Sequence, residues 1–164
     1  MLSTIEALSG PRIERVRITP LIPSTLPGRE RERFIDASFR ILSGYPVRRF
    51  REYAGEDDRF TKEGKRIVTL PFDHRSAASI PTTEGPVFPT FQFEEDGSLH
   101  WLVNISSRFI KEGWRRADWW TAPNEGLGGV RPVSLLNTDR QNDELKDAVS
   151  ALYVPRPKVV YESL

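Results

Sequence analysis

Residues 114–136 read WRRADWWTAPNEGLGGVRPVSLL, and this stretch decides the expected fold of the C-terminal half of the chain. Residues 114–121 are expected to form a short helix, because a proline follows shortly after and stops it. Gly128 and Gly129 permit a positive φ or a close approach to another helix. Pro132 then suits the first turn of a new helix. The stretch therefore predicts a tight helix–loop–helix corner.

Two further segments of this half carry apolar residues at helical spacing. The first begins at Ser98, a fair N-cap, and extends to about Lys111. The second begins at Asn142 or Asp143, and its apolar positions i, i+3, i+4 and i+7 are Leu145, Ala148, Val149 and Leu152. We therefore expect a helical domain over residues 94–155 and an extended tail over residues 156–164.

The N-terminal half begins with an arm and continues with two expected helices. Residues 1–28 are rich in proline and contain the alternation Ile13-Glu14-Arg15-Val16-Arg17-Ile18. This alternation is typical of a strand, while the prolines favour an edge or docked-arm position over a central one. Residues 29–43 show helical spacing and end at Gly44. A second, arginine-rich helix over residues 47–53 would complete a helix–turn–helix-like unit.

Two apolar segments downstream are expected to pair as a β-hairpin, or wing. They are residues 64–71 and residues 87–93, separated by a polar loop. With this wing, the helix–turn–helix-like unit spans residues 29–93. The expected fold class is therefore mostly α with a small β-hairpin, in which the arm and this unit precede the C-terminal helical domain.

Composition is that of an ordinary globular chain, with 38% apolar and 29% charged residues. There is no cysteine, which rules out disulfides and thiolate metal sites. No apolar run reaches the roughly 18 residues that a membrane helix needs. Residues 1–10 also lack the basic start and apolar core of a signal peptide. We therefore expect a cytoplasmic protein with no membrane partner.

Motifs for catalysis or cofactor binding are not found in the sequence. His74 and His100 lack the spacing to other ligands that a metal site requires. The acidic groups at residues 57–58 and 94–96 lie in polar turns, where paired carboxylates usually remain solvated. The glycines of residues 126–129 lack the flanking features of a phosphate loop. We expect a binding protein rather than an enzyme, without cofactor or metal, and a small hydrolase remains the minority alternative.

The corner and its flanks resemble the C-terminal toxin-binding domain of the Xre/MbcA/ParS antitoxin family. The matching positions follow the family order and are Trp119, Trp120, Pro123, Asn124, Leu127, Gly129, Pro132, Leu135 and Leu136, with an amphipathic helix after them. Upstream, residues 87–93 (VFPTFQF) resemble the aromatic-Pro-x-Phe-Gln-Phe segment that many members carry before this domain. A polar run at residues 138–142 replaces the glycine that is usual before the last helix. The resemblance covers about residues 87–153.

The resemblance implies a protein that binds and neutralises a cognate toxin. Such a toxin is usually a RES-domain protein that destroys NAD, and the antitoxin covers its active-site entrance. The implied assembly is either a homo-oligomer or a toxin–antitoxin hetero-oligomer. The tail either fills a cleft of the partner or is a docked or disordered segment of its own chain. The residues expected to contact the partner are Trp114, Trp120, Asn124, Leu127, Arg131, Lys158, Tyr161 and Leu164.

Three tryptophans lie close together in this region, at positions 114, 119 and 120. Trp119 is expected in the core, since large aromatic side chains dominate the energetics of burial. A core role for all three tryptophans is the favoured interpretation. The alternative is that Trp114 or Trp120 is exposed as an interface anchor, because neighbouring positions point to different faces of a helix.

A DNA-binding regulator of phage or operon type is the alternative function. Its phosphate contacts would come from Arg48, Arg49 and Arg51 on the second helix and from Lys65 and Arg66 in the wing. The first 82 residues hold 15 Lys and Arg against 11 Asp and Glu, and the remainder hold 9 against 12. This mild bias permits contact with operator DNA without requiring it. Since the short helix has no Asn, Gln or Ser to read base edges, the unit is either a working DNA-binding unit or a scaffold.

Overall fold

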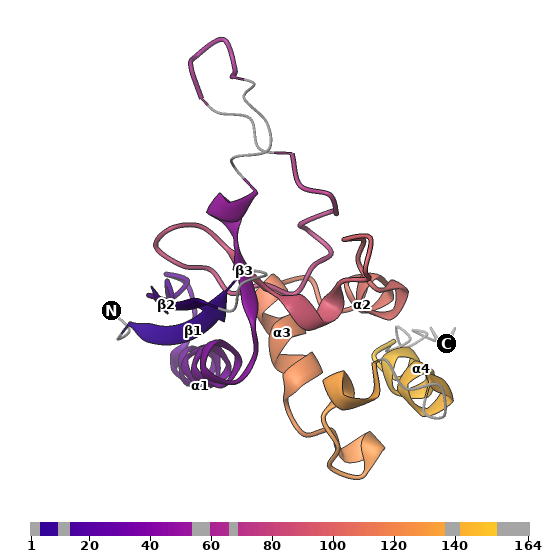
Figure 1. Ribbon diagram of the computed structural model, residues 1–164. Helices are drawn as coiled ribbons and strands as arrows, with labels where there is room; N and C mark the ends of the chain where they lie inside the picture. Colours follow the sequence, from indigo (N-terminus) through magenta and orange to yellow (C-terminus); the bar gives the residue numbers. More distant parts are fainter. Residues whose placement is uncertain (1–3, 10–13, 54–59, 66–68, 137–141, 154–164) are drawn as a thin grey trace, which may run out of the picture.

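The N-terminal half forms a four-stranded mixed sheet (Figure 1). The computed structural model describes residues 4–9, 14–53, 60–65, 69–136 and 142–153. The strands are β1 (Ile5–Ser9), β2 (Glu14–Ile18), β3 (Val47–Arg49) and β4 (Val87–Pro89). Their order in space is β2-β1-β3-β4. β1 pairs antiparallel with β2 and parallel with β3, and β3 pairs antiparallel with β4.

Backbone pairing continues beyond β4 at one edge of the sheet and reaches the residues that follow β2 at the other edge. Val87 of β4 forms an isolated antiparallel bridge with Ile80, and Thr82 forms another with Pro20, just beyond β2. Residues 80–82 therefore connect β4 back to the continuation of β2. The two edge strands of the sheet, β2 and β4, are therefore linked through this one short segment.

Helix α1 (Gly28–Gly44) packs against the sheet and forms much of the first core. Its buried side chains recur at helical spacing, which gives the helix one apolar face. Pro46 follows its end closely, where a proline cannot continue a helix. The first core consists of Ala7, Ile18, Phe34, Ala37, Ile41, Leu42, Val47, Ala78, Ile80, Val87, Trp114 and Ala117.

The C-terminal half is built from three helices and several short 3-10 turns. The helices are α2 (Trp101–Ser106), α3 (Gly113–Thr121) and α4 (Asn142–Ser150). The 3-10 turns among the described residues are η1 (Phe50–Glu52), η2 (Thr90–Gln92), η3 (Glu125–Leu127) and η4 (Pro132–Leu135). Their apolar faces form a second core of Leu102, Val103, Trp120, Leu135, Leu136, Leu145 and Val149.

Helix α3 belongs to both cores. Trp114 near its start packs edge-on against Phe34 of α1, with ring centroids 5.4 Å apart, whereas Trp120 near its end lies in the second core. Asp118, on the side facing α1, is only 6% exposed and accepts hydrogen bonds from Arg33 at 3.1 Å and Arg40 at 2.5 Å. The two halves therefore share one central helix.

Two buried polar side chains, one on α3 and one on η2, form hydrogen bonds to the loop before β4. The guanidinium of Arg116, on α3, donates to the carbonyls of Ala77, Ile110, Lys111 and Arg75. Gln92 bonds both backbone groups of Ala78, accepting from its N–H at 2.7 Å and donating to its carbonyl at 2.8 Å. Because buried polar groups are costly unless paired, these bonds fix residues 75–78 against α3 and η2.

The expected fold class, mostly α with a small β-hairpin, is wrong: the protein is an α/β fold with a mixed sheet. The second helix expected over residues 47–53 is strand β3 followed by turn η1. The expected wing is also wrong, because β4 pairs with β3, and residues 64–65 and 69–71 are not strand. Pairing with distant segments outweighs the local helical spacing of residues 47–53. The described residues therefore form no helix–turn–helix.

Other expectations are confirmed. The helix expected over residues 29–43 is α1, and the strand expected in the arm is β2, which lies at the edge of the sheet formed by the described strands. Gly128 and Gly129 have positive φ values of 67° and 85°, as the corner requires. The helix expected from Ser98 is shorter: α2 begins at Trp101, and His100 rather than Ser98 provides its cap.

No helix in the described part of the chain combines the length and apolar character needed to span a bilayer.

Candidate functional site

The residues that carry the family resemblance form the interior of the C-terminal corner. Trp120 is fully buried, and its indole N–H donates to the hydroxyl of Ser106 at 3.1 Å. Leu135 and Leu136 are buried beside it, and the partly buried Leu127 packs against the same core. These residues hold α2, α3 and α4 together, so the motif describes the framework of the corner.

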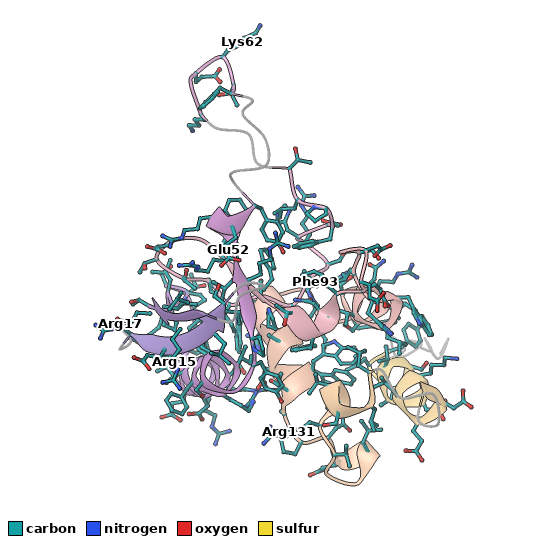
Figure 2. All side chains as sticks on the ribbon, viewed as in Figure 1. Arg15, Arg17, Glu52, Lys62, Phe93 and Arg131 are labelled. Atoms are coloured by element: carbon teal, nitrogen blue, oxygen red, sulfur yellow. The ribbon has the colours of Figure 1, made fainter. Side chains whose placement is uncertain are left out.

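The loop between α3 and η4 is held by its own backbone and by Arg131. Asn124 donates its backbone N–H to Val130 at 3.1 Å and accepts one from Gly129 at 2.9 Å. Arg131 donates to the carbonyl of Thr121, the last residue of α3, where a cation interacts favourably with the helix dipole. Arg131 lies at the outer end of this corner (Figure 2). Asn124 and Arg131 are both half-buried and therefore reach the surface only in part.

The alternative in which Trp114 or Trp120 is exposed is wrong. Trp114 is 3% exposed and Trp120 is fully buried, because the two cores lie on different sides of α3. Trp119, expected in the core, is only partly buried and packs edge-on against Trp120 with centroids 5.0 Å apart. Neither Trp114 nor Trp120 can therefore anchor a partner in this conformation.

Aromatic side chains are exposed instead where α2 and α4 pack together. Trp101 is 48% exposed, Phe109 37% and Tyr153 62%. Tyr153 packs edge-on against Phe109 with centroids 6.0 Å apart, and the Lys146 ammonium lies 5.4 Å from the centroid of the Trp101 ring. We call these four residues the α2–α4 aromatic surface. Large exposed aromatic side chains in one place are typical of an interaction site.

This surface was partly accessible to sequence reasoning. Trp101 directly precedes Leu102, an inward-facing residue of the expected helix, so it has to point elsewhere. Tyr153 lies beyond the end of α4, where periodicity gives no information. Lys158, Tyr161 and Leu164, which were expected to contact the partner, lie outside the described residues, as does Arg66.

The arginines expected to bind DNA point to different partners. Arg48 lies over the ring of Tyr53, 4.2 Å from its centroid, and Arg49 donates to Glu52 at 3.0 Å. Arg51 lies 3.9 Å from Glu84. Lys65 belongs to a separate turn over residues 60–65, which stands away from the body of the protein (Figure 2). These residues therefore do not share one helix face.

Glu52 forms a small polar cluster with Ser9 and Arg49. It accepts hydrogen bonds from the Ser9 hydroxyl and from Arg49. Burial raises the pKa of the Glu52 carboxyl, but the bonds from Ser9 and Arg49 outweigh it and hold the pKa below its ordinary value. Glu52 is therefore an ionised partner for β1 and β3 rather than a proton donor.

His100 has a structural role at the start of α2. Its Nδ1 accepts the backbone N–H of Leu102 at 3.1 Å, and its ring stacks on that of Trp101. Burial lowers the pKa of His100, partly opposed by the carboxylate of Glu94 3.9 Å from Nε2. Within the described ranges no three His, Asp or Glu side chains are grouped as metal ligands.

Comparison with protein-family models, with curated proteins and with solved structures finds no match. The resemblance to the antitoxin family therefore rests on the quoted motif positions.

Proposed function

We propose that this chain is an antitoxin-like protein that binds and neutralises a cognate protein toxin through its C-terminal corner. The observation that carries the proposal is the α2–α4 aromatic surface, exposed on a corner whose interior is made of the motif residues. The motif supplies the framework, and Trp101, Phe109 and Tyr153 supply the contact.

The chemistry of this surface defines the partner that fits it. Tryptophan and tyrosine are common anchors of protein interfaces, because each buries a large apolar area with few rotatable bonds. Around them, the solvent side of α4 exposes Asp143, Glu144 and Asp147. The complementary partner surface is an apolar cleft that carries basic groups opposite these three carboxylates.

The sequence position of the C-terminal tail supports the same assignment. Tyr153, which belongs to the aromatic surface, is followed in the sequence by 11 more residues. A partner bound at Trp101 and Tyr153 would therefore have the tail within reach of its own cleft. In the family that the corner resembles, such a cleft is the active-site entrance of a RES-domain toxin that destroys NAD.

The test is inhibition of a RES-domain protein from the same genome, measured as NAD consumption against antitoxin concentration. Wild-type protein should suppress the activity at stoichiometric ratio. Trp101→Ala combined with Tyr153→Ala should weaken the complex by about 2 kcal/mol, a roughly 30-fold rise in Kd. Because both side chains are exposed, the variant should remain folded.

The matched control is Phe39→Ala, which removes an aromatic side chain that is 63% exposed on α1. It should leave inhibition unchanged. Wild-type affinity in the Trp101 and Tyr153 variant would remove the α2–α4 aromatic surface from the interface. Failure of the wild-type protein to bind or inhibit any such toxin would contradict the proposed function itself.

A further inference from the structure

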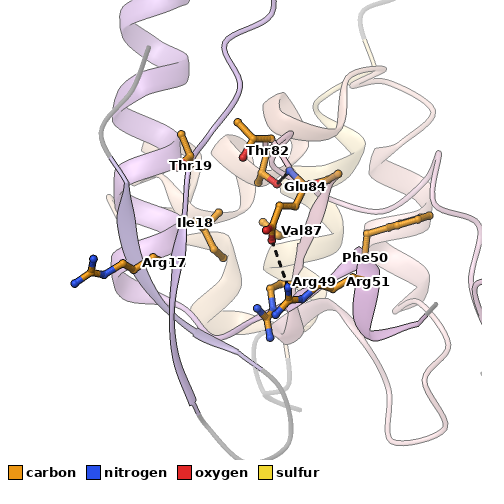
Figure 3. Close-up of a pocket in the computed structure, with 11 residues that line it drawn as sticks. Arg17, Ile18, Thr19, Arg49, Phe50, Arg51, Thr82, Glu84 and Val87 are labelled. Atoms are coloured by element: carbon orange, nitrogen blue, oxygen red, sulfur yellow. Dashed lines mark hydrogen bonds and ion pairs between the residues drawn. The ribbon is translucent and has the colours of Figure 1, made fainter. Parts of the chain in front are cut away.

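A small polar pocket lies at the end of β3, remote from the α2–α4 aromatic surface (Figure 3). Its volume is about 100 Å³, and it is bounded by the end of β2, the end of β3 and the turn before β4. The side chains that matter for its chemistry are Thr19, Arg49, Arg51, Thr82 and Glu84. The pocket thus places two guanidinium groups, those of Arg49 and Arg51, in a small space.

Within the described parts of the chain, Arg49 forms a hydrogen bond through only one of its donors. It lies on the same side of β3 as the buried Val47, and its side chain is only 17% exposed. Its Nε donates to Glu52, which the Ser9 hydroxyl also holds. Among the residues that the structure describes, no acceptor bonds either terminal amino group of Arg49. Glu52 therefore orients the guanidinium through Nε, and the terminal N–H groups remain able to donate to a ligand.

Arg51 supplies the second charge and is only loosely paired. Its ion-pair partner among the described residues is Glu84, at 3.9 Å, which is too long for a hydrogen bond. Both side chains are more than half exposed, 58% and 63%, so the pair is weak and screened by solvent. Figure 3 shows Arg49 and Arg51 side by side with Glu84 across from them, while Arg17 points away.

The surrounding polar groups determine what can enter. The hydroxyl of Thr82 is occupied, since it donates to the carbonyl of Gly85 and accepts the N–H of Glu84. The hydroxyl of Thr19 is bonded to that of Thr4 at 3.0 Å. The free hydrogen-bonding capacity of the pocket is therefore dominated by guanidinium donors, which match the planar or tetrahedral oxygens of a carboxylate or a phosphate.

We infer that this pocket binds an oxyanion group, of the size of phosphate or carboxylate, between Arg49 and Arg51. The anion would accept from both guanidinium groups and displace Glu84, which now occupies the pocket edge as a weak internal substitute. Binding would relieve the repulsion between the two adjacent positive charges. This inference does not depend on the proposed toxin contact, which lies on other elements.

The experiment is an NMR titration of the arginine side-chain N–H signals with inorganic phosphate and, separately, with acetate at constant ionic strength. We expect saturable shifts of the Arg49 and Arg51 signals with at least one of the two anions. Saturation by phosphate alone assigns a phosphate-bearing ligand, and saturation by acetate alone assigns a carboxylate. Saturation by both assigns a site for either group.

Two variants with opposite expected effects make the test specific. Arg51→Gln removes one charge-assisted contact and should raise the Kd about tenfold. Glu84→Gln removes the competing carboxylate and should lower the Kd. Arg108→Gln, an exposed arginine outside the pocket, is the control and should leave the Kd unchanged. Shifts that do not saturate, or a Kd equal to wild type in both pocket variants, would overturn the inference.

Discussion

At the scale of single residues, His100 shows how a side chain that is unremarkable in sequence acquires a defined role. It caps α2 through Nδ1, a task for which Ser98 was the better candidate by cap preference. Sequence could not choose between them, because the choice depends on where Gln92 holds the chain: its carbonyl accepts the N–H of His100 at 2.8 Å. By contrast, the positive φ of Gly128 and Gly129 followed from local chemistry alone.

The cap makes stability depend on pH in a defined direction. Burial places the pKa of His100 below its ordinary value of 6.5, so the unfolded chain binds the proton more tightly. The contribution of neutral His100 is therefore complete above pH about 6.5 and is lost as the pH falls through the lowered pKa. Urea unfolding between pH 7.5 and 5 should show this loss, and His100→Asn, which keeps a capping acceptor, should reduce the slope. His74→Asn is the control; a slope unchanged by His100→Asn would contradict the assignment.

At the scale of elements, residues 47–53 show the limit of periodicity. Val47, Phe50 and Tyr53 have helical spacing, yet Val47 pairs with Ser9 on one side and with Pro89 on the other. The pairing of β1 with β3 crosses all of β2 and α1, and no local pattern encodes it. The C-terminal helices were easier to predict, because the spacing of their apolar residues is a local feature.

Helix α3 gives the sharpest prediction at this scale, because each of its ends fills a different core. Trp114→Ala and Trp120→Ala should each lower the free energy of unfolding by about 3–5 kcal/mol, through lost burial and the cavity left behind. Trp101→Ala, at an exposed position, should change it by about 0.5 kcal/mol or less. Denaturant unfolding followed by circular dichroism measures all three. Near-wild-type stability of either buried variant would mean that α3 does not join the two cores.

At the scale of the whole molecule, the boundary expected between residues 93 and 94 divides a shared core. A fragment of residues 94–153 would lose the contact of Trp114 with Phe34 and the carbonyls of Ala77 and Arg75 that hold Arg116. We expect this fragment to lack a cooperative unfolding transition in calorimetry, whereas the full chain should show one. Cooperative unfolding of the isolated fragment would instead support two separable domains.

The turn over residues 60–65 lies between β3 and β4 in the chain, and Lys62 marks its tip far from the body (Figure 2). The strands on either side of it pair directly with each other. A chain opened at this turn would yield two pieces, each carrying one half of the same ladder and a different part of the core. The turn is thus a suitable place to split the protein for fragment complementation. Two partner proteins fused to the two pieces would bring them together, and pairing of β3 with β4 would report that the partners interact.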